Sequence, residues 1–508
     1  MRPLPIQSSV NAWTSSVVLL ERWLRGRGRV DTLLEEAGRE RAPGLPRETQ
    51  SHRERRPAAA QPAGAGSAVM PDRQERARCQ HLLFGAVRNL GRLDSLLETM
   101  ISRVPRARLR AVLLLAGFEL LEAGTAAAGG GQEARIVHHA VNKAKLLLSP
   151  PEVRLVNAVL RKLVCAPGLF AEPPSPAADA AELARHFSHP EWLVRRWLTQ
   201  FGAGATFQLL RWNQTPPPIH ARWRGGSGGG GTARGSESGA PGCRPDESGA
   251  GTAQGGRIER PGFLQPTPWD GFHVVSAGHW PEIEQLLADG ALYLQDPATA
   301  IAPQLLAPKA GETVLDLCAA PGGKSLLLAD LMEEQARPPG SGAEQGRLVT
   351  VDLPDSRRIE RLKENLARAK TTDVVLVQAD VLDLSPRLLK EHHLPAAFAA
   401  ILLDVPCSNT GVMRHRVDVK WRLREADIAK HARRQLALLN AAARFVLPGG
   451  RLVYSTCSLE PEENEGVVET FLRAARGGFA LEQTRYSRPW EAGCDGAGAF
   501  LLRRQAVG

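Results

Sequence analysis

Cysteine is scarce in this 508-residue chain, and its seven cysteines include no Cys-x-x-Cys pair. Structural zinc sites usually take ligands from such pairs, so we expect no metal site. A sparse and odd-numbered set of thiols is also typical of a reducing compartment. It therefore predicts free cysteines and a cytoplasmic protein.

Long hydrophobic runs are missing as well. No apolar segment approaches the roughly 20 residues that a membrane-spanning helix needs. Val17–Leu20 is too short for the core of a signal peptide. Aromatic residues make up only 5% of the chain, but hydrophobic residues together make up 43%, enough for a sizeable core. At this length we expect roughly two to four domains.

Acidic residues are under-represented in the first third of the chain. Residues 1–170 hold 26 Lys and Arg residues against 15 Asp and Glu residues, whereas the remainder holds 38 and 39. The formal net charge of +10 therefore comes from the front of the chain. This asymmetry favours contact of the front part with a polyanion such as nucleic acid.

A small helical bundle is predicted over residues 12–165, because apolar residues recur there at helical spacing. The predicted helical segments are Ser16–Leu24, Cys79–Asn89, Leu93–Ile101, Arg108–Leu121, Ile136–Leu147 and Pro151–Val164.

Three stretches without periodicity interrupt the chain, at residues 40–70, 225–257 and 336–346. They are rich in Gly, Pro, Ser or Ala, and we interpret them as inserts. The second insert splits a small domain that contains HPEWLVRRWLTQF, His189–Phe201. This segment predicts a short amphipathic helix whose Trp192 and Trp197 pack into a core.

From about residue 291, strand-like runs alternate with helical stretches, which predicts a doubly wound parallel sheet of the α/β class. The predicted strands are Thr313–Leu317, Arg347–Asp352, Val374–Gln378, Ala399–Asp404 and Arg451–Ser455.

The first of these strands runs into a turn of small residues, VLDLCAAPGGKS at Val314–Ser325. Such a turn lets backbone N–H groups and a helix N-terminus approach a ligand closely. A phosphate-binding loop would need glycine at position 318, where this chain has Cys318. The pattern therefore argues against a nucleoside triphosphatase.

Acidic residues follow the next two strands. Asp352 ends RLVTVD, where a carboxylate can accept both hydroxyls of a ribose. Asp380 follows the third strand in VLVQAD and would reach the adenine side. Either acid alone is equally consistent with a cap at a strand end. Together with the loop they indicate a cofactor that contains adenosine.

Two cysteines stand just past the fourth and fifth predicted strands. Cys407 lies in ILLDVPCSNTG, three residues after Asp404, and Cys457 lies in RLVYSTCSLEPEENE. Ligands bind at the carboxyl ends of strands in an open parallel sheet, so both thiols are expected to face one crevice.

Two thiols suit methylation of cytosine at carbon 5. Addition of a thiolate at carbon 6 makes carbon 5 nucleophilic towards a sulfonium methyl group, and elimination then restores the thiol. A protonated Asp404 would donate a hydrogen bond to ring nitrogen 3. The residues alone do not decide which thiol attacks. They also leave Cys407, a water molecule and Asp404 as candidates for the base that removes the proton from carbon 5.

These motifs resemble those of the RNA 5-methylcytosine methyltransferases of the RsmB (Fmu/Sun) family. The resemblance rests on CAAPGGK (Cys318–Lys324), DVPCSNTG (Asp404–Gly411) with Lys420-Trp421 downstream, and YSTCSLEPEENE (Tyr454–Glu465). Phe84–Glu98 and Ile136–Leu163 are similar to the NusB-like RNA-binding domain that precedes this catalytic domain. His189–Leu198 is similar to the connector of the family.

The resemblance implies a NusB-like helical domain at residues 10–165, a small α+β connector at 180–290 and a Rossmann-like catalytic domain at 291–506. It also implies that Cys457 is the nucleophile and that Cys407 assists release of the product. The implied S-adenosylmethionine site is lined by Cys318, Ala319, Ala320, Pro321, Gly322, Gly323, Lys324, Asp352, Asp380 and Asp404.

The implied substrate is a flipped or unpaired cytosine in RNA, with 16S ribosomal RNA of the small subunit as the leading candidate. We predict backbone contacts from five basic side chains, Lys143, Lys145, Arg154, Arg161 and Lys162. A tRNA substrate is one alternative, and a non-catalytic RNA-binding assembly factor is another. A DNA cytosine methyltransferase would use the thiol of the Pro-Cys motif instead.

Overall fold

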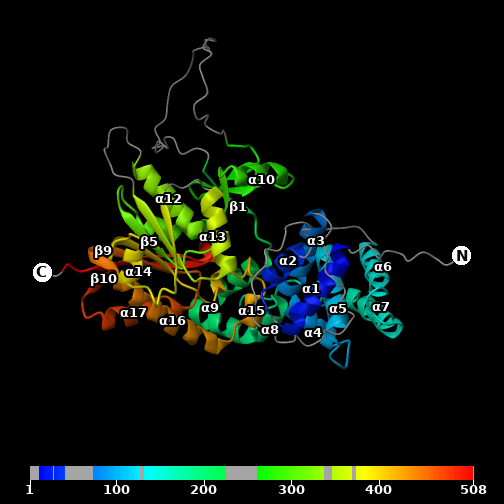
Figure 1. Ribbon diagram of the computed structural model, residues 1–508. Coiled ribbons are helices and arrows are strands. Elements are labelled where there is room, and N and C mark those ends of the chain that lie inside the picture. Colours follow the sequence, from blue (N-terminus) through cyan, green and yellow to red (C-terminus); the bar gives the residue numbers. More distant parts are fainter. Residues whose placement is uncertain are drawn as a thin grey trace, which may run out of the picture. The chain divides into compact units, whose positions relative to one another are not determined.

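The computed structural model describes residues 11–26, 28–39, 73–125, 131–166, 168–224, 260–336, 346–368 and 373–506. The inserts predicted at 40–70 and 225–257 lie outside these residues, as does nearly all of the insert at 336–346. The chain forms two compact units (Figure 1). One comprises Met1–Pro216 with Met413–Glu425, and the other comprises Pro217–Val412 with Ala426–Gly508.

The first unit is helical throughout its described residues. Its elements are α1 (Ala12–Gly26), α2 (Val30–Arg39), α3 (Arg73–Arg88), α4 (Leu90–Glu98), α5 (Ala107–Thr125), α6 (Gln132–Ala144), α7 (Pro150–Val164), α8 (Ala180–His186), α9 (Glu191–Gln214) and α15 (Val419–Arg422). The bundle predicted from apolar spacing is therefore confirmed. Helix α2 was not predicted, and α9 runs well past Phe201 through a kink at Gly202.

Local sequence explains where several of these helices begin. Ser149 and Glu152 form a reciprocal capping box at the start of α7, and Pro150 occupies the first turn, where its missing N–H is not needed.

The core of the unit is continuous and aliphatic, and it includes the fully buried Trp13 and Trp23. Trp197 is also fully buried, as predicted, whereas Trp192 is half-buried.

The second unit begins with a small antiparallel sheet. Its elements are β1 (His220–Trp223), β2 (Leu264–Pro266), β3 (Phe272–Val275), α10 (Trp280–Ala288) and β4 (Leu292–Leu294), and the strand order is β2-β3-β1-β4. Arg222 and Arg224, at the end of β1, both form ion pairs with Asp330. Asp330 lies on α12 (Gly323–Ala336), so these ion pairs fix the small sheet to the larger part of the unit.

A seven-stranded sheet forms the centre of the second unit, with helices on both faces (Figure 1). Its strands are β5 (Thr313–Leu317), β6 (Arg347–Asp352), β7 (Val374–Gln378), β8 (Phe398–Asp404), β9 (Val446–Thr456), β10 (Phe479–Ser487) and β11 (Ala497–Arg504). The helices are α11 (Ile301–Leu306), α12, α13 (Ser356–Arg368), α14 (Pro386–Glu391), α16 (Glu425–Ala443), α17 (Glu465–Ala474) and α18 (Pro489–Ala492). Short 3-10 turns, η1 (Pro297–Ala300), η2 (Thr410–Val412) and η3 (Pro461–Glu463), complete the unit.

The strand order is β10-β11-β9-β8-β5-β6-β7, and the five strands from β9 to β7 run parallel. Strands β10 and β11 form an antiparallel edge. The chain proceeds outward from β5 in one direction through β6 and β7, and then in the other direction through β8 and β9. The reversal point therefore lies between β5 and β8, where open α/β sheets bind their ligands at the carboxyl ends of the strands.

The predicted α/β architecture is confirmed, including all five predicted strands. Three of them have the predicted bounds, while β8 begins one residue earlier and β9 begins at Val446. Two hydrophobic clusters cover the opposite faces of the sheet. No described helix has the length and hydrophobicity required to cross a membrane.

Candidate active site

The loop between β5 and α12 is held in a tight, irregular path. Cys318 has a φ of 61° and Gly322 a φ of 104°, and the Gly322 N–H donates to the Ala319 carbonyl at 2.8 Å. A Cβ atom on Gly322 would lie 2.8 Å from the Leu362 side chain, so only glycine fits at this position. Helix α12 starts at Gly323, which places its N-terminus at the loop.

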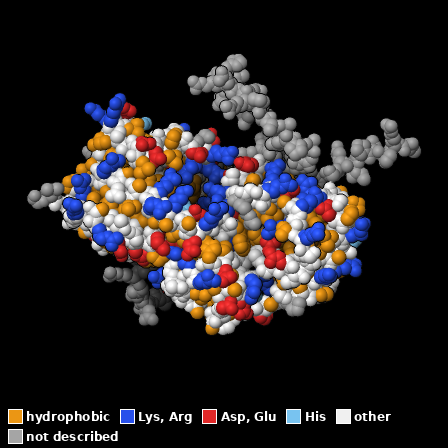
Figure 2. Space-filling view, turned by 90° about the horizontal axis from the view of Figure 1, so that it is seen from below, with side chains coloured by type: hydrophobic (Ala, Val, Ile, Leu, Met, Phe, Trp, Pro, Cys, Tyr) orange, Lys and Arg blue, Asp and Glu red, His pale blue; other side chains and the backbone are white. Residues whose placement is uncertain are grey.

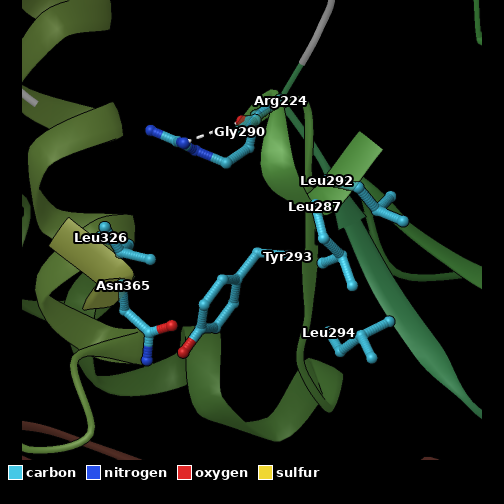
Figure 3. A pocket seen from close by; sticks show the side chains of 8 residues that line it. All are labelled: Arg224, Leu287, Gly290, Leu292, Tyr293, Leu294, Leu326 and Asn365. Carbon is cyan, nitrogen blue, oxygen red and sulfur yellow. Dashed lines mark hydrogen bonds between the residues drawn. The ribbon is translucent and has the colours of Figure 1, made fainter. Parts of the chain in front are cut away.

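Neighbouring elements clamp this loop from outside the sheet. The Gln295 amide donates to the Gly323 carbonyl at 3.0 Å, and the Asn365 amide donates to the Pro321 carbonyl at 2.7 Å. A pocket of about 200 Å³ lies beside these contacts (Figure 3). Figure 3 shows Tyr293 from β4 and Asn365 from α13 pointing toward one another across it. The small sheet thus helps to shape the predicted cofactor loop.

Asp352, at the end of β6, is 2% exposed, and its carboxylate is fully engaged. It accepts hydrogen bonds from the backbone N–H groups of Ala320 (2.8 Å) and Leu353 (2.9 Å). The Arg358 guanidinium adds two more, at 3.0 and 2.9 Å. A carboxylate offers about four lone-pair positions, so two ribose hydroxyls would have to take the place of Arg358.

Asp380 lies in the turn after β7. Its carboxylate accepts from the Leu382 backbone N–H at 2.9 Å, which is a turn-capping contact. The adjacent Ala379 N–H donates to the Asp352 carbonyl at 3.0 Å, so the ends of β6 and β7 are joined. Both acidic residues that the sequence singled out therefore lie at the same edge of the sheet.

Asp316, within β5, was not predicted as a site residue. Its side chain is buried and accepts a hydrogen bond of 2.5 Å from the Ser325 hydroxyl. Among the described residues, its other oxygen has no hydrogen-bond partner. Burial raises the pKa of Asp316 to about 7, and the negative charge of Asp404 contributes in the same direction.

Lys324 and Asp404 form an ion pair at the reversal point of the sheet. The Lys324 ammonium lies 2.6 Å from Asp404 Oδ2, and the Ser455 hydroxyl donates to Asp404 Oδ1 at 2.8 Å. Burial alone would lower the pKa of Lys324, but the attraction and hydrogen bond of Asp404 raise it above the ordinary value. Both oxygens of Asp404 are acceptors here, whereas the sequence suggested a donor role for this side chain.

The two predicted thiols meet. Cys407 Sγ and Cys457 Sγ are 3.2 Å apart, although the residues are 50 positions apart in the chain. Cys407 is 6% exposed and Cys457 is more accessible. The hydrogen bond with Cys457, reinforced by burial, raises the pKa of the Cys407 thiol well above its ordinary value. Cys407 therefore holds its proton, and the more accessible Cys457 lines a groove together with Lys324, Ser455 and Thr456.

A buried glutamate supports both thiol-bearing loops. Glu463 accepts from the Ser408 backbone N–H at 2.9 Å, the Ser458 hydroxyl at 2.9 Å and the Gln435 amide at 2.8 Å. The Asn409 side chain, 3.4 Å from Cys457 Sγ, also contacts the thiol pair. The acidic run that includes Glu463 is visible in the sequence, but the complete burial of Glu463 and of its neighbour Glu460 is not.

The second unit has an open, mostly parallel sheet, with a glycine-containing loop after the first strand of that sheet and acidic residues at the ends of the following strands. These features define a Rossmann-like, nucleoside-binding class of enzyme. Comparison with known proteins narrows this class. Residues 303–496 match the family model of the 16S rRNA methyltransferases RsmB/F, and residues 49–164 match that of the NusB family.

Relatives of similar length point to the same family. The chain is 31% identical over 407 residues to ribosomal RNA small subunit methyltransferase B of Klebsiella pneumoniae, covering 78% of this chain and 82% of the relative. It is 29% identical to the probable enzyme of the same name from Bacillus subtilis, over 79% and 80% of the two chains. The crystal structure of PH0851 shares the fold, with a TM-score of 0.66, 21% identity and coverage of 98% and 99%.

The chain therefore belongs to the RsmB/F family of methyltransferases, and its cofactor is S-adenosylmethionine. The described residues fit this cofactor. Gly322 has the positive φ that favours glycine, and its loop leads into the N-terminus of α12. Asp352 and Asp404 end the two strands that flank β5, so their carboxylates lie at the same edge of the sheet as this loop. The unpartnered oxygen of the buried Asp316 is a further acceptor at the same sheet edge.

Proposed function

We propose that this protein transfers a methyl group from S-adenosylmethionine to carbon 5 of a cytosine in small-subunit ribosomal RNA. The single observation that carries the proposal is the pair of thiols 3.2 Å apart at the reversal point of the sheet. Methylation at carbon 5 needs a nucleophile for carbon 6 and a second group that assists the elimination. The names of the related methyltransferases support ribosomal RNA as the substrate.

In this proposal, Cys457 is the nucleophile. It is the more accessible thiol and lines the groove, so its sulfur can reach carbon 6 of a base that enters there. Cys407 is buried with a raised pKa, so it is suited to hold or exchange a proton rather than to attack. Once carbon 5 is methylated, a base takes its proton, the freed electron pair restores the double bond between carbons 5 and 6, and Cys457 leaves carbon 6 as a thiolate. Cys407, a water molecule and Asp404 are the candidates for this base, and Cys407 assists the release.

Asp404 and Lys324 act on the ring of the bound cytosine. Attack at carbon 6 pushes an electron pair towards ring nitrogen 3, which then needs a hydrogen-bond donor. A protonated Asp404 would donate this hydrogen bond, and the Lys324 ammonium, 2.6 Å from Asp404 Oδ2, holds the carboxyl group in place. Ser455 fixes the orientation of the carboxyl group through its bond to Oδ1.

The remaining predicted site residues hold the cofactor. S-adenosylmethionine supplies the methyl group on a positively charged sulfonium. The Cys318–Lys324 loop presents its backbone and the start of α12, while Asp352 binds the ribose hydroxyls and Asp380 lies on the adenine side. Asp316, which the sequence analysis missed, adds a buried acceptor for a positively charged group of the ligand.

The helical unit is proposed to bind RNA, and the three-domain division at 10–165, 180–290 and 291–506 stays a prediction. The five basic side chains predicted to contact RNA lie on α6 and α7 or directly after α6, and four of them are exposed. These two helices run next to each other (Figure 1). Lys and Arg side chains are visible on the exposed surface of the protein in Figure 2.

The experiment uses the full chain, labelled S-adenosylmethionine and unmodified small-subunit RNA, with mass spectrometry of the product nucleoside. We expect 5-methylcytidine from the parent protein and none from Cys457→Ala. Cys407→Ala should accumulate a covalent protein–RNA adduct that resists denaturing electrophoresis, because the release step is impaired. Cys165→Ala removes an exposed thiol in the helical unit and serves as the matched control.

The outcomes separate the candidate functions. Methylation of tRNA in preference to ribosomal RNA would support the tRNA alternative. An adduct that accumulates with Cys457→Ala instead of Cys407→Ala would reverse the two thiol roles. If the protein binds RNA tightly but transfers no methyl group to either RNA, or to partly assembled subunits, the proposed catalytic function is wrong.

A further inference from the structure

The segment Met413–Glu425 directly follows the catalytic loop in sequence but belongs to the helical unit. Val417 is 1% exposed and forms part of the hydrophobic core of that unit, and Trp421 packs against the same core. The chain thus leaves the catalytic unit after Val412, contributes to the helical core and returns at Ala426. We call Met413–Glu425 the anchor segment.

Lys420 is buried to an unusual degree for a lysine, at 1% exposure. Its ammonium donates a hydrogen bond of 2.9 Å to the carbonyl of Arg88, the last residue of α3. Carbonyls at the end of a helix lack partners within the helix and carry the negative end of its dipole. Burial, together with the charge of Arg88, lowers the pKa of Lys420. A cation is retained in such a place only where it makes a specific contact.

Trp421 and Arg414 add contacts on either side of Lys420. The indole N–H of Trp421 donates to the Val87 carbonyl at 2.8 Å, and a Cβ atom on Gly91 would lie 2.7 Å from the Trp421 ring. Arg414 donates to the Thr215 carbonyl at 3.0 Å, and its guanidinium lies 4.0 Å from the centre of the Trp212 ring. The Arg88 guanidinium in turn donates to the Arg414 carbonyl at 3.1 Å.

The preceding loop is held equally firmly within the catalytic unit. The Gly411 N–H donates to the Cys457 carbonyl at 3.0 Å, and the Gly411 carbonyl accepts from the Gly496 N–H at 2.8 Å. Only three residue steps separate Gly411 from Arg414, a span of at most about 11 Å for a fully extended chain. The anchor segment and the loop that carries Cys407 are therefore joined by a short covalent tether.

We propose that Lys420 and Trp421 are positioning residues for the methyl-transfer reaction. Their bonds to the last carbonyls of α3 hold the loop Asp404–Val412 so that Cys407 stays buried against Cys457. The helical unit, besides its proposed contacts with RNA, is then required to assemble the thiol pair. The expected effect on methyl transfer rests on the proposed function, whereas the expected effect on the burial of Cys407 does not.

Two substitutions remove the anchor bonds while keeping an apolar side chain at each position. Lys420→Met removes the ammonium, and Trp421→Phe removes the indole N–H while keeping an aromatic ring. The matched controls are Lys430→Met on the exposed surface of α16 and Trp192→Phe on α9. All variants are full chains, and circular dichroism with thermal unfolding establishes that each one is folded. Trp421→Phe is the milder change and decides the matter if Lys420→Met does not fold.

The first readout is the rate at which iodoacetamide alkylates Cys407, measured by peptide mass spectrometry in the absence of RNA and cofactor. Loss of one buried hydrogen bond is expected to raise this rate by about fivefold or more, with no change in the controls. The second readout is single-turnover methyl transfer, which should slow by a similar factor while the dissociation constants for RNA and S-adenosylmethionine stay unchanged.

The readouts distinguish this inference from the proposed function. If the parent protein transfers no methyl group, the proposed function fails and the alkylation of Cys407 alone decides the inference. Unchanged alkylation of Cys407 in the folded variants would overturn it. So would faster alkylation with an unchanged transfer rate, because the anchor would then have no bearing on the reaction.

Discussion

Replacing Asp316 with Asn should make the stability of the catalytic sheet less dependent on pH. Asp316 is 1% exposed, and burial raises its pKa to about 7 from an ordinary value of 3.8. An acid whose pKa is raised on folding favours the folded state while it is protonated. That contribution is fully present below the ordinary pKa and is lost as the pH rises through about 7. Asn keeps the shape and remains neutral throughout.

The expected magnitude follows from the size of the shift. The shift is about three pKa units, and each unit corresponds to about 1.4 kcal/mol. Part of the loss occurs below pH 5, so between pH 5 and pH 8 the Asn variant should gain about 2–3 kcal/mol of unfolding free energy relative to the parent. The hydroxyl of Ser325, which donates to the Asp316 carboxylate, can bond equally well to the amide oxygen of Asn.

Urea unfolding of the cofactor-free protein tests this prediction, with hydrogen exchange of the β5 and β6 amides to report on this sheet specifically. Glu360→Gln, on the exposed surface of α13, is the matched control because it removes a solvent-exposed carboxyl group from the same unit. An equal difference between Asp316→Asn and the parent at pH 5 and pH 8 would refute the reasoning, since it would mean that the buried carboxyl does not titrate in this range.

Two further predictions concern ligand binding. Arg358→Gln should tighten S-adenosylmethionine binding by up to about fivefold, because the half-exposed Arg358 contributes no more than about 1 kcal/mol to its pair with Asp352 and must give way to the ribose. Isothermal titration calorimetry measures the change, and weaker binding would show that Arg358 assists the cofactor instead. Substituting Arg161 and Lys162 together by Gln should weaken RNA binding and reduce the slope of log affinity against log salt concentration by about 1–2. Filter binding at several salt concentrations measures this slope, and an unchanged slope would remove α7 from the RNA interface.

The catalytic motifs were predictable because each is local in sequence. A strand-like run that is followed by small residues, an acid or a cysteine predicts a strand, and it predicts that the following residues lie at the carboxyl edge of the sheet. Asp352, Asp404, Cys407 and Cys457 were identified in this way, and each lies at the end of a strand of the sheet. The placement of Cys407 beside Cys457 was expected as well, provided that β8 and β9 are neighbours, which they are.

The partners of these residues were not predictable, because they come from distant parts of the chain or from the unremarkable faces of helices. Nothing in the sequence pairs Arg358 with Asp352, or shows that Glu460 and Glu463 are the buried members of their acidic run. Helix α2 was overlooked because its periodic segment is short and ends next to the first low-complexity stretch. Lys420 was noticed only as part of a family motif.

The sequence by itself determined the order of the elements, the class of fold and the candidate reacting groups, because hydrophobic periodicity and short motifs depend on neighbouring residues. The tertiary structure decided which charges are buried, which acceptors are already occupied and which unit holds the anchor segment. Those properties arise from packing between residues up to about 330 positions apart, as between Arg88 and Lys420. Burial then sets the electrostatic environment of each group, and a linear pattern carries no measure of burial.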